Sequence, residues 1–263
     1  MNKKYFVIMV MTFLFSFVCL QGYRPARSEV ITDTEKWQKL AESASQQNIP
    51  GEDLVEILNI VQQADMEGFP VDPLLNKALE GMAKRAPSSI IIKVLKTKLD
   101  GFHVSRKILN QLDDIENESA SQREESLIIL SESLSRGVSE QELETLSRYA
   151  TTPRSVSLAN ASQDLATFKG LGFPLADAME IVRTGLENGI YRKRSRGIST
   201  AVSEAREKGI SDEELKDIFL SNIRGGRGME GILHLRQNQR QLRPSPSQKG
   251  GQPKGGSRFR SPR

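Results

Sequence analysis

The stretch "LGFPLADAMEIVRTGLENG", residues 171–189, has the pattern of a turn followed by one short helix. An earlier stretch, "EGFPVDPLLNKALEGM" at residues 67–82, has the same order: Gly-Phe-Pro, then apolar residues at helical spacing, then a second glycine. Neither contains a G-x-G-x-x-G or Walker pattern, so the glycines do not indicate a phosphate-binding loop. A glycine just past a helix can adopt the left-handed conformation that satisfies the last carbonyl groups. Both stretches therefore predict a turn between helices.

The same kind of turn signal recurs along the chain, with a glycine or polar residue, an apolar residue, and often proline or serine. The eight triplets are Asn48-Ile49-Pro50, Gly68-Phe69-Pro70, Arg85-Ala86-Pro87, Gly101-Phe102-His103, Gly137-Val138-Ser139, Gly172-Phe173-Pro174, Gly189-Ile190-Tyr191 and Gly209-Ile210-Ser211. Their middle residues are 20, 17, 16, 36, 35, 17 and 20 positions apart, so the two long intervals are about twice a short one. Fixed spacing of this kind is typical of repeat proteins.

The apolar periodicity between the turns predicts an all-α fold. The segment 175–186 shows the i, i+3, i+4, i+7 spacing of an amphipathic helix. We expect an array of about ten short antiparallel helices over residues 32–223, built from helical hairpins in the manner of an α-solenoid. A single short helix cannot bury its apolar stripe alone, so its neighbours must supply the core. Residues 113–122 and 151–155 are expected to be plain turns, and Trp37 is expected to pack the first helix onto the array.

The first residues have the order of a secretory signal peptide. Lys3 and Lys4 precede an uncharged apolar run at residues 5–20, which is short for a membrane-spanning helix. We expect a signal peptide at residues 1–22, a short linker at 23–31, and a periplasmic or secreted bacterial protein. An uncleaved anchor is one alternative. A lipoprotein attached at Cys19 is another, although Val18 stands where a small residue is preferred.

The charges divide the chain into an acidic body and a basic tail. Residues 23–223 carry 25 Lys+Arg against 32 Asp+Glu, a net −7, whereas residues 224–263 carry 10 against 1, a net +9. The tail is rich in Gly, Pro, Ser and Gln, which predicts disorder. Its arginines are candidates for binding anionic lipid, a wall polymer or nucleic acid, or the acidic body itself. These candidates are Arg236, Arg240, Arg243, Arg258 and Arg260.

Two further segments carry candidate binding residues. In "DDIENESASQREE" (113–125), Asp114, Glu116, Glu118 and Glu125 fall at positions one, three, five and twelve of a calcium loop. Position six is a serine instead of the glycine that the sharp turn requires, so a solvated acidic junction is the competing interpretation. In "YRKRSRG" (191–197), a basic cluster could bind an anion or could simply be an exposed helix face. Its members are Arg192, Lys193, Arg194 and Arg196.

Catalytic patterns are absent from the sequence. The two histidines, His103 and His234, lie in different regions, and His103 falls in a predicted turn. Removal of the signal peptide would leave no cysteine, so neither a zinc site nor a thiolate nucleophile is predicted. We therefore expect no catalytic, cofactor or metal site other than the weak calcium candidates. The favoured interpretation is a non-enzymatic scaffold or adaptor in the bacterial envelope that binds a protein partner. The alternatives are an envelope hydrolase using paired carboxylates, or a secreted polyanion binder acting through the tail.

Overall fold

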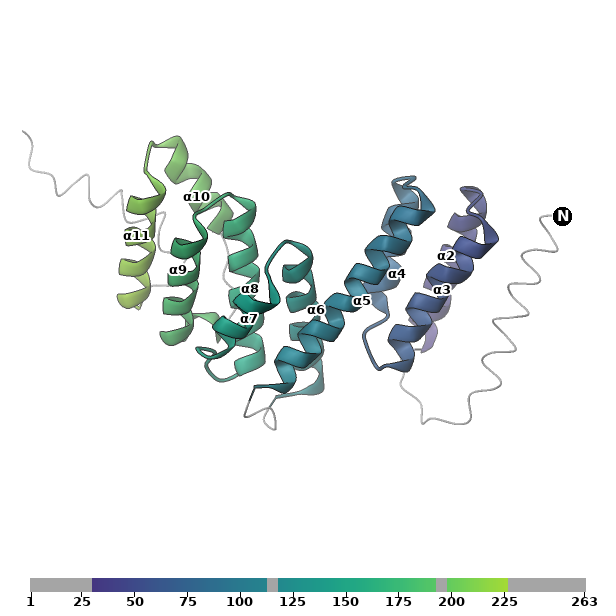
Figure 1. Ribbon diagram of the computed structural model, residues 1–263, viewed down its shortest axis with the longest axis horizontal. Coiled ribbons are helices and arrows are strands. Elements are labelled where there is room, and N and C mark those ends of the chain that lie inside the picture. Colours follow the sequence, from purple (N-terminus) through teal and green to yellow (C-terminus); the bar gives the residue numbers. More distant parts are fainter. Residues whose placement is uncertain (1–29, 113–117, 193–197, 227–263) are drawn as a thin grey trace, which may run out of the picture.

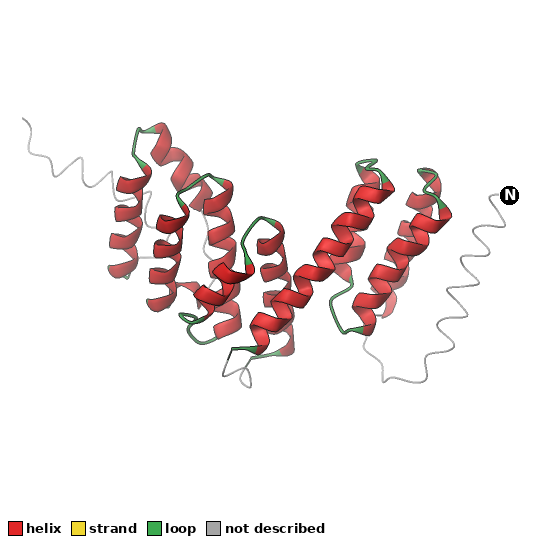
Figure 2. Ribbon diagram, in the orientation of Figure 1, coloured by secondary structure: helices red, strands yellow, loops and turns green. Residues whose placement is uncertain are grey.

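The computed structural model describes residues 30–112, 118–192 and 198–226, and these residues form ten α-helices and one 3₁₀-helix without any strand (Figure 1). Figure 2 shows the helices joined by short loops. The elements are α2 (Val30–Gln46), α3 (Gly51–Met66), α4 (Asp72–Ala83), α5 (Ser88–Asn110), α6 (Ala120–Ser135), α7 (Glu140–Ser147), α8 (Arg154–Gly170), α9 (Leu175–Glu187), η2 (Ile190–Arg192), α10 (Ile198–Glu207) and α11 (Asp212–Arg224). The all-α prediction is thereby confirmed for the described part of the chain.

Three of the predictions fall wholly or largely outside the described residues. These are the signal peptide, most of the linker and most of the basic tail. Within the three described ranges, no helix combines the length and apolar character needed to cross a membrane.

Seven of the eight predicted turns are confirmed. The first residue of each has a positive φ: Asn48, Gly68, Arg85, Gly137, Gly172, Gly189 and Gly209. The residue after the glycine closes the preceding helix, since the Phe69 amide donates to the Ala64 carbonyl (2.8 Å) and the Phe173 amide to the Phe168 carbonyl (3.0 Å). Serine then caps the next helix in two turns, as where the Ser139 hydroxyl accepts the Glu142 amide at 3.2 Å. Local sequence signals therefore determine most helix ends.

The turn predicted at Gly101-Phe102-His103 was wrong, because α5 runs unbroken through these residues for 23 positions. Gly101 is instead a close-contact position: a Cβ atom there would lie 2.8 Å from the Ser131 hydroxyl of α6. Phe102 is fully buried, which keeps this part of α5 in the core. His103 consequently lies on a helix and not in a turn.

The helices pack in a regular order. Every extensive helix–helix contact joins helices that are one or two places apart in the chain. Contacts two places apart link α2 to α4, α6 to α8 and α8 to α10, and likewise α3, α5, α7, α9 and α11 in succession. The even-numbered and odd-numbered helices thus form two layers, broadly in chain order along the longest axis (Figure 1). Among the described helices of the even layer, α4 and α6 are the one successive pair without an extensive contact.

Two apolar cores lie along this array. The first extends from Leu40 to Phe102 and joins α2 to α5, with Trp37 packed against it as predicted. The second extends from Ile108 to Ile223 and is centred on α8. The long helix α5 contributes residues to both cores, so it connects the two halves of the molecule.

Candidate binding site

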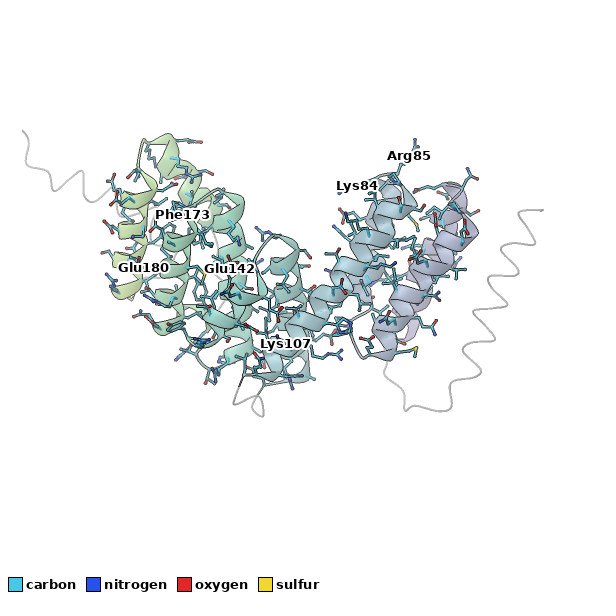
Figure 3. The ribbon with its side chains drawn as sticks, in the orientation of Figure 1. Lys84, Arg85, Lys107, Glu142, Phe173 and Glu180 are labelled. Atoms are coloured by element: carbon cyan, nitrogen blue, oxygen red, sulfur yellow. The ribbon has the colours of Figure 1, made fainter. Side chains whose placement is uncertain are left out.

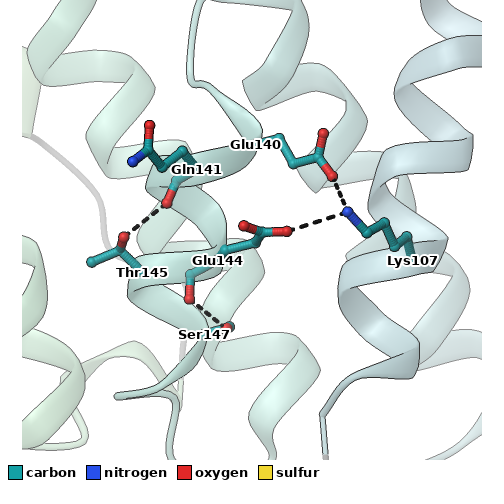
Figure 4. Close-up of polar contacts among 6 residues, drawn as sticks. All are labelled: Lys107, Glu140, Gln141, Glu144, Thr145 and Ser147. Atoms are coloured by element: carbon teal, nitrogen blue, oxygen red, sulfur yellow. Dashed lines mark hydrogen bonds and ion pairs between the residues drawn. The ribbon is translucent and has the colours of Figure 1, made fainter.

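Surface lysines form ion pairs that link neighbouring helices. Lys107 of α5 reaches Glu140 (2.5 Å) and Glu144 (3.3 Å) of α7, as the dashed lines in Figure 4 show. The hydrogen bond to Glu140 raises the pKa of Lys107. Lys107 and Glu142 lie in the central part of the array, and Glu180 lies towards its C-terminal end (Figure 3).

Similar ion pairs link helices elsewhere in the C-terminal half. Lys169 of α8 holds Glu142 of α7 at 2.8 Å. Lys216 of α11 holds Asp177 (3.0 Å) and Glu180 (3.3 Å) of α9. In each of these places, the carboxylates of one helix form ion pairs with a lysine of a neighbouring helix.

Helix α8 is the central element of the C-terminal half and is buried on most of its circumference. Eleven of its 17 residues are buried, among them Ser155, Asn160 and Asp164. Its first turn is fixed by Glu118, whose carboxylate accepts the Ser155 amide at 2.9 Å. The Ser126 hydroxyl of α6 donates to the Ser155 hydroxyl at 3.2 Å and joins the two helices near this end.

The short helix η2 packs against both α8 and α9. The Asn160 side-chain amide donates to the Tyr191 carbonyl at 2.9 Å. The Tyr191 ring is fully buried, and a Cβ atom on Gly185 would lie 2.5 Å from it. Burial raises the pKa of Tyr191 well above its ordinary value, and the nearby Asp164 carboxylate raises it further. The next residue, Arg192, is therefore held at a defined place on the surface.

A small cavity opens between α6, α8 and η2, and we call it the Arg192 cavity. It has a volume of about 180 Å³ and is lined by Glu125, Ser126, Ile129, Val156, Ala159, Asn160 and Arg192. Cavities for drug-sized ligands are about 300–1,000 Å³, so this one suits a single side chain or a small group.

The lining of the Arg192 cavity combines apolar and charged groups. Ile129, Val156 and Ala159 supply the apolar part. Glu125 and Arg192 are exposed at its edge, and no ion pair joins them to each other or to another described residue. Two opposite charges that do not neutralise each other are available to a ligand with complementary groups. The cavity thus has an apolar part beside two charged side chains at its edge.

The structure brings two of the predicted binding residues together and places a third at a helix end. Glu125 and Arg192, which the sequence assigned to different candidate sites, meet at one cavity. Glu118 caps α8, and α6 begins at Ala120, so residues 120–125 of the suggested calcium loop are helical. In the described ranges no three metal-ligating side chains come together. The remaining candidates lie outside the described residues: Asp114, Glu116, Lys193, Arg194, Arg196, Arg236, Arg240, Arg243, Arg258 and Arg260.

Of the two histidines, only His103 lies in the described part of the chain. His103 lies 3.2 Å from Glu67 and edge-on to the Phe69 ring at 5.0 Å. Beside it, the Arg106 guanidinium stacks on the same ring at 3.4 Å and donates to the Glu67 carbonyl at 2.8 Å. These contacts fasten the α3–α4 turn to α5, which is a structural role. His234 lies outside the described residues.

Sequence reasoning missed Ser126 and Asn160. The signal for Asn160 was the stretch "RSVSLANASQDLATFKG" (154–170), which has no clear apolar stripe although it lies between amphipathic helices. A helix of this composition must be covered on several sides by close neighbours.

Comparison with protein-family models, curated proteins and solved structures finds no match for this chain.

Proposed function

We propose that this protein is a non-enzymatic helical-repeat scaffold or adaptor of the bacterial envelope, which binds a protein partner through its helical surface. The observation that carries the proposal is the two-layer order, in which every extensive helix–helix contact joins helices one or two places apart in the chain. Stacked helical hairpins of this kind expose long surfaces, and such surfaces are typical protein-binding elements. The recurrence of the seven turns that the structure contains supports the repeat interpretation.

The Arg192 cavity is the proposed centre of that binding surface. It is large enough for one apolar side chain of a partner, with Arg192 and Glu125 available to polar groups beside it. Binding energy at protein interfaces concentrates in a few residues that fill well-packed pockets. The basic tail adds a contact with a polyanion that depends strongly on salt, and the signal-peptide pattern supports export.

Crosslinked capture from the native bacterial envelope tests the proposal. Four forms are compared: the full chain, a chain ending at Gly226, and the full chain with Arg192→Glu or Arg148→Glu. Arg148 is the matched control, because it is exposed and lies outside the cavity. We expect one defined protein to be captured by the full chain, the shortened chain and Arg148→Glu, and to be lost with Arg192→Glu.

The salt of the wash distinguishes the alternatives. Contacts between exposed charges are screened beyond about 8 Å at 0.15 M salt and beyond about 3 Å at 1 M. A partner held in the cavity should survive a wash at about 1 M salt. If all bound material disappears with the tail or with salt, the adaptor proposal is wrong and the protein is a polyanion binder.

A further inference from the structure

The packing of α4 and α6 on α5 differs from the rest of the array, because these two helices lack an extensive contact with each other. Successive helices of the even layer contact each other extensively, except for this pair. Both nevertheless contact α5. The middle of α5 is thus in contact with two helices that make no extensive contact with each other. We call this place the Lys98 junction, formed by Lys77 of α4, Lys98 of α5 and Glu132 of α6.

Lys98 is an unusual residue for such a place. Only 9% of its surface is exposed, and it is the one charged residue among the buried side chains of α5. Its ammonium lies over the Phe102 ring, 5.6 Å from the centroid. No carboxylate of the described residues lies within ion-pair distance of it. Its aliphatic stem is buried, whereas the ammonium nitrogen still reaches solvent and has no ion-pair partner in the described part of the chain.

The neighbouring charges do not compensate Lys98. Lys77 is already bound to Glu80 at 2.8 Å, and it lies close enough to Lys98 to repel it. Glu132 attracts Lys98 across the junction but remains exposed. Burial lowers the pKa of Lys98 more than Glu132 raises it, so the ammonium lacks a partner that would stabilise its charge.

We propose that the Lys98 junction binds a carboxylate side chain of a protein partner, with Lys98 forming the ion pair and α4 and α6 flanking it. The proposal rests on the protein-binding function given above, but it concerns a second site in the other half of the array. A carboxylate is the occupant that the charge favours, since a charge-assisted hydrogen bond to a partly desolvated ammonium is strong. The Phe102 ring beneath the ammonium holds the lysine in place before the partner arrives.

The test uses the full chain with isotope-labelled lysine and follows the Lys98 resonances by NMR. The probe is the acetylated, amidated peptide Ala-Ala-Glu-Glu-Ala-Ala, and its Gln-Gln counterpart is the neutral control. We expect the glutamate peptide to shift the Lys98 signals and raise the pKa of Lys98, because an opposite charge favours the ammonium form. The glutamine peptide should do neither.

Two variants with the same charge change separate this site from general attraction. Lys98→Met keeps the buried apolar stem and should weaken binding of the glutamate peptide about tenfold. Lys93→Met removes an exposed lysine of the same helix and should change the affinity less than about twofold. Equal losses in both variants, or Lys98 signals that inorganic phosphate moves and the peptide does not, would overturn the proposal. Because the Arg192 capture experiment uses neither the peptide nor Lys98, the two proposals fail separately.

Discussion

The core around α2 to α4 and the core around α8 bury different kinds of side chain. In α4 the buried positions are Leu74, Leu75, Ala78 and Met82, which form one apolar stripe. Among the described residues of α2 to α4, no polar side chain is buried. In α6 and α8, by contrast, the buried positions include eight polar residues: Ser126, Ser131, Ser133, Ser155, Ser157, Asn160, Ser162 and Asp164.

The difference follows from how closely the helices approach. Small serines let α6 and α8 pack side by side over much of their length, and each hydroxyl must then find a partner. The Ser133 hydroxyl lies 2.9 Å from the Ile129 carbonyl, the Ser162 hydroxyl lies 2.7 Å from the Ala159 carbonyl, and the two hydroxyls lie 3.0 Å apart. Because each hydroxyl has one proton, one serine donates to the other across the interface while the second donates to a carbonyl of its own helix. The part of the first core formed by α2 to α4 thus depends on apolar burial alone, whereas the second core adds a polar seam between α6 and α8.

The largest effect is expected from Phe168→Ala in the second core. Phe168 is fully buried, and its ring lies 5.2 Å from Phe173 and 5.4 Å from Phe219, so its loss leaves a cavity lined by aromatic rings. The free energy of unfolding should fall by about 3–5 kcal/mol, measured by urea unfolding with circular dichroism.

Hydrogen exchange on the same variant tests whether the two cores unfold separately. Among the described helices, only α5 and α6 have residues packed against both cores. Exchange should therefore accelerate in α8 to α11 more than in α3 and α4. Leu75→Ala in the first core should cost about 2–5 kcal/mol and give the reverse pattern. Equal acceleration throughout both variants would show one cooperative unit and remove the distinction.

A smaller effect is expected from Gly185→Ala in α9. Alanine favours a helix by about 1 kcal/mol over glycine, but here its Cβ would lie 2.5 Å from the buried Tyr191 ring. The ring cannot move freely, so a net loss of about 1–3 kcal/mol is expected in thermal or urea unfolding. Gly170→Ala in α8 is the control, since nothing lies within 4 Å of its new Cβ, and it should not destabilise the protein.

The helix ends could be predicted from the sequence because their signals are local. A residue such as Gly172 or Gly209, followed by an apolar residue and Pro or Ser, carries the capping information within a few positions. Gly101 has a similar sequence, yet it lies inside α5, where the absence of a Cβ leaves room for Ser131, 30 positions later. Local pattern alone could not distinguish a capping glycine from one that admits a neighbouring helix.

The candidate site was predictable only in part, for the same reason. Arg192 stood out because it begins a basic cluster. Asn160 and Ser126 had no local signal of this kind, since their roles arise where α6, α8 and η2 meet. Lys98 likewise looked like one of several lysines of its segment, and only the packing of α4 and α6 on α5 makes it exceptional.

The smallest effect concerns the polar seam itself and is measured by a double-mutant cycle at Ser133 and Ser162. Their hydroxyl oxygens lie 3.0 Å apart across the α6–α8 interface, buried from solvent. Each single change to alanine should cost about 0.5–1.5 kcal/mol in urea unfolding, because it removes the cross-helix bond and leaves a small void. The double variant should cost less than the sum of both, since the bond is lost only once and no hydroxyl is left without its partner. Strictly additive losses would mean that each serine is stabilised by its own helix alone. The second core would then owe its stability to apolar packing, as the first does.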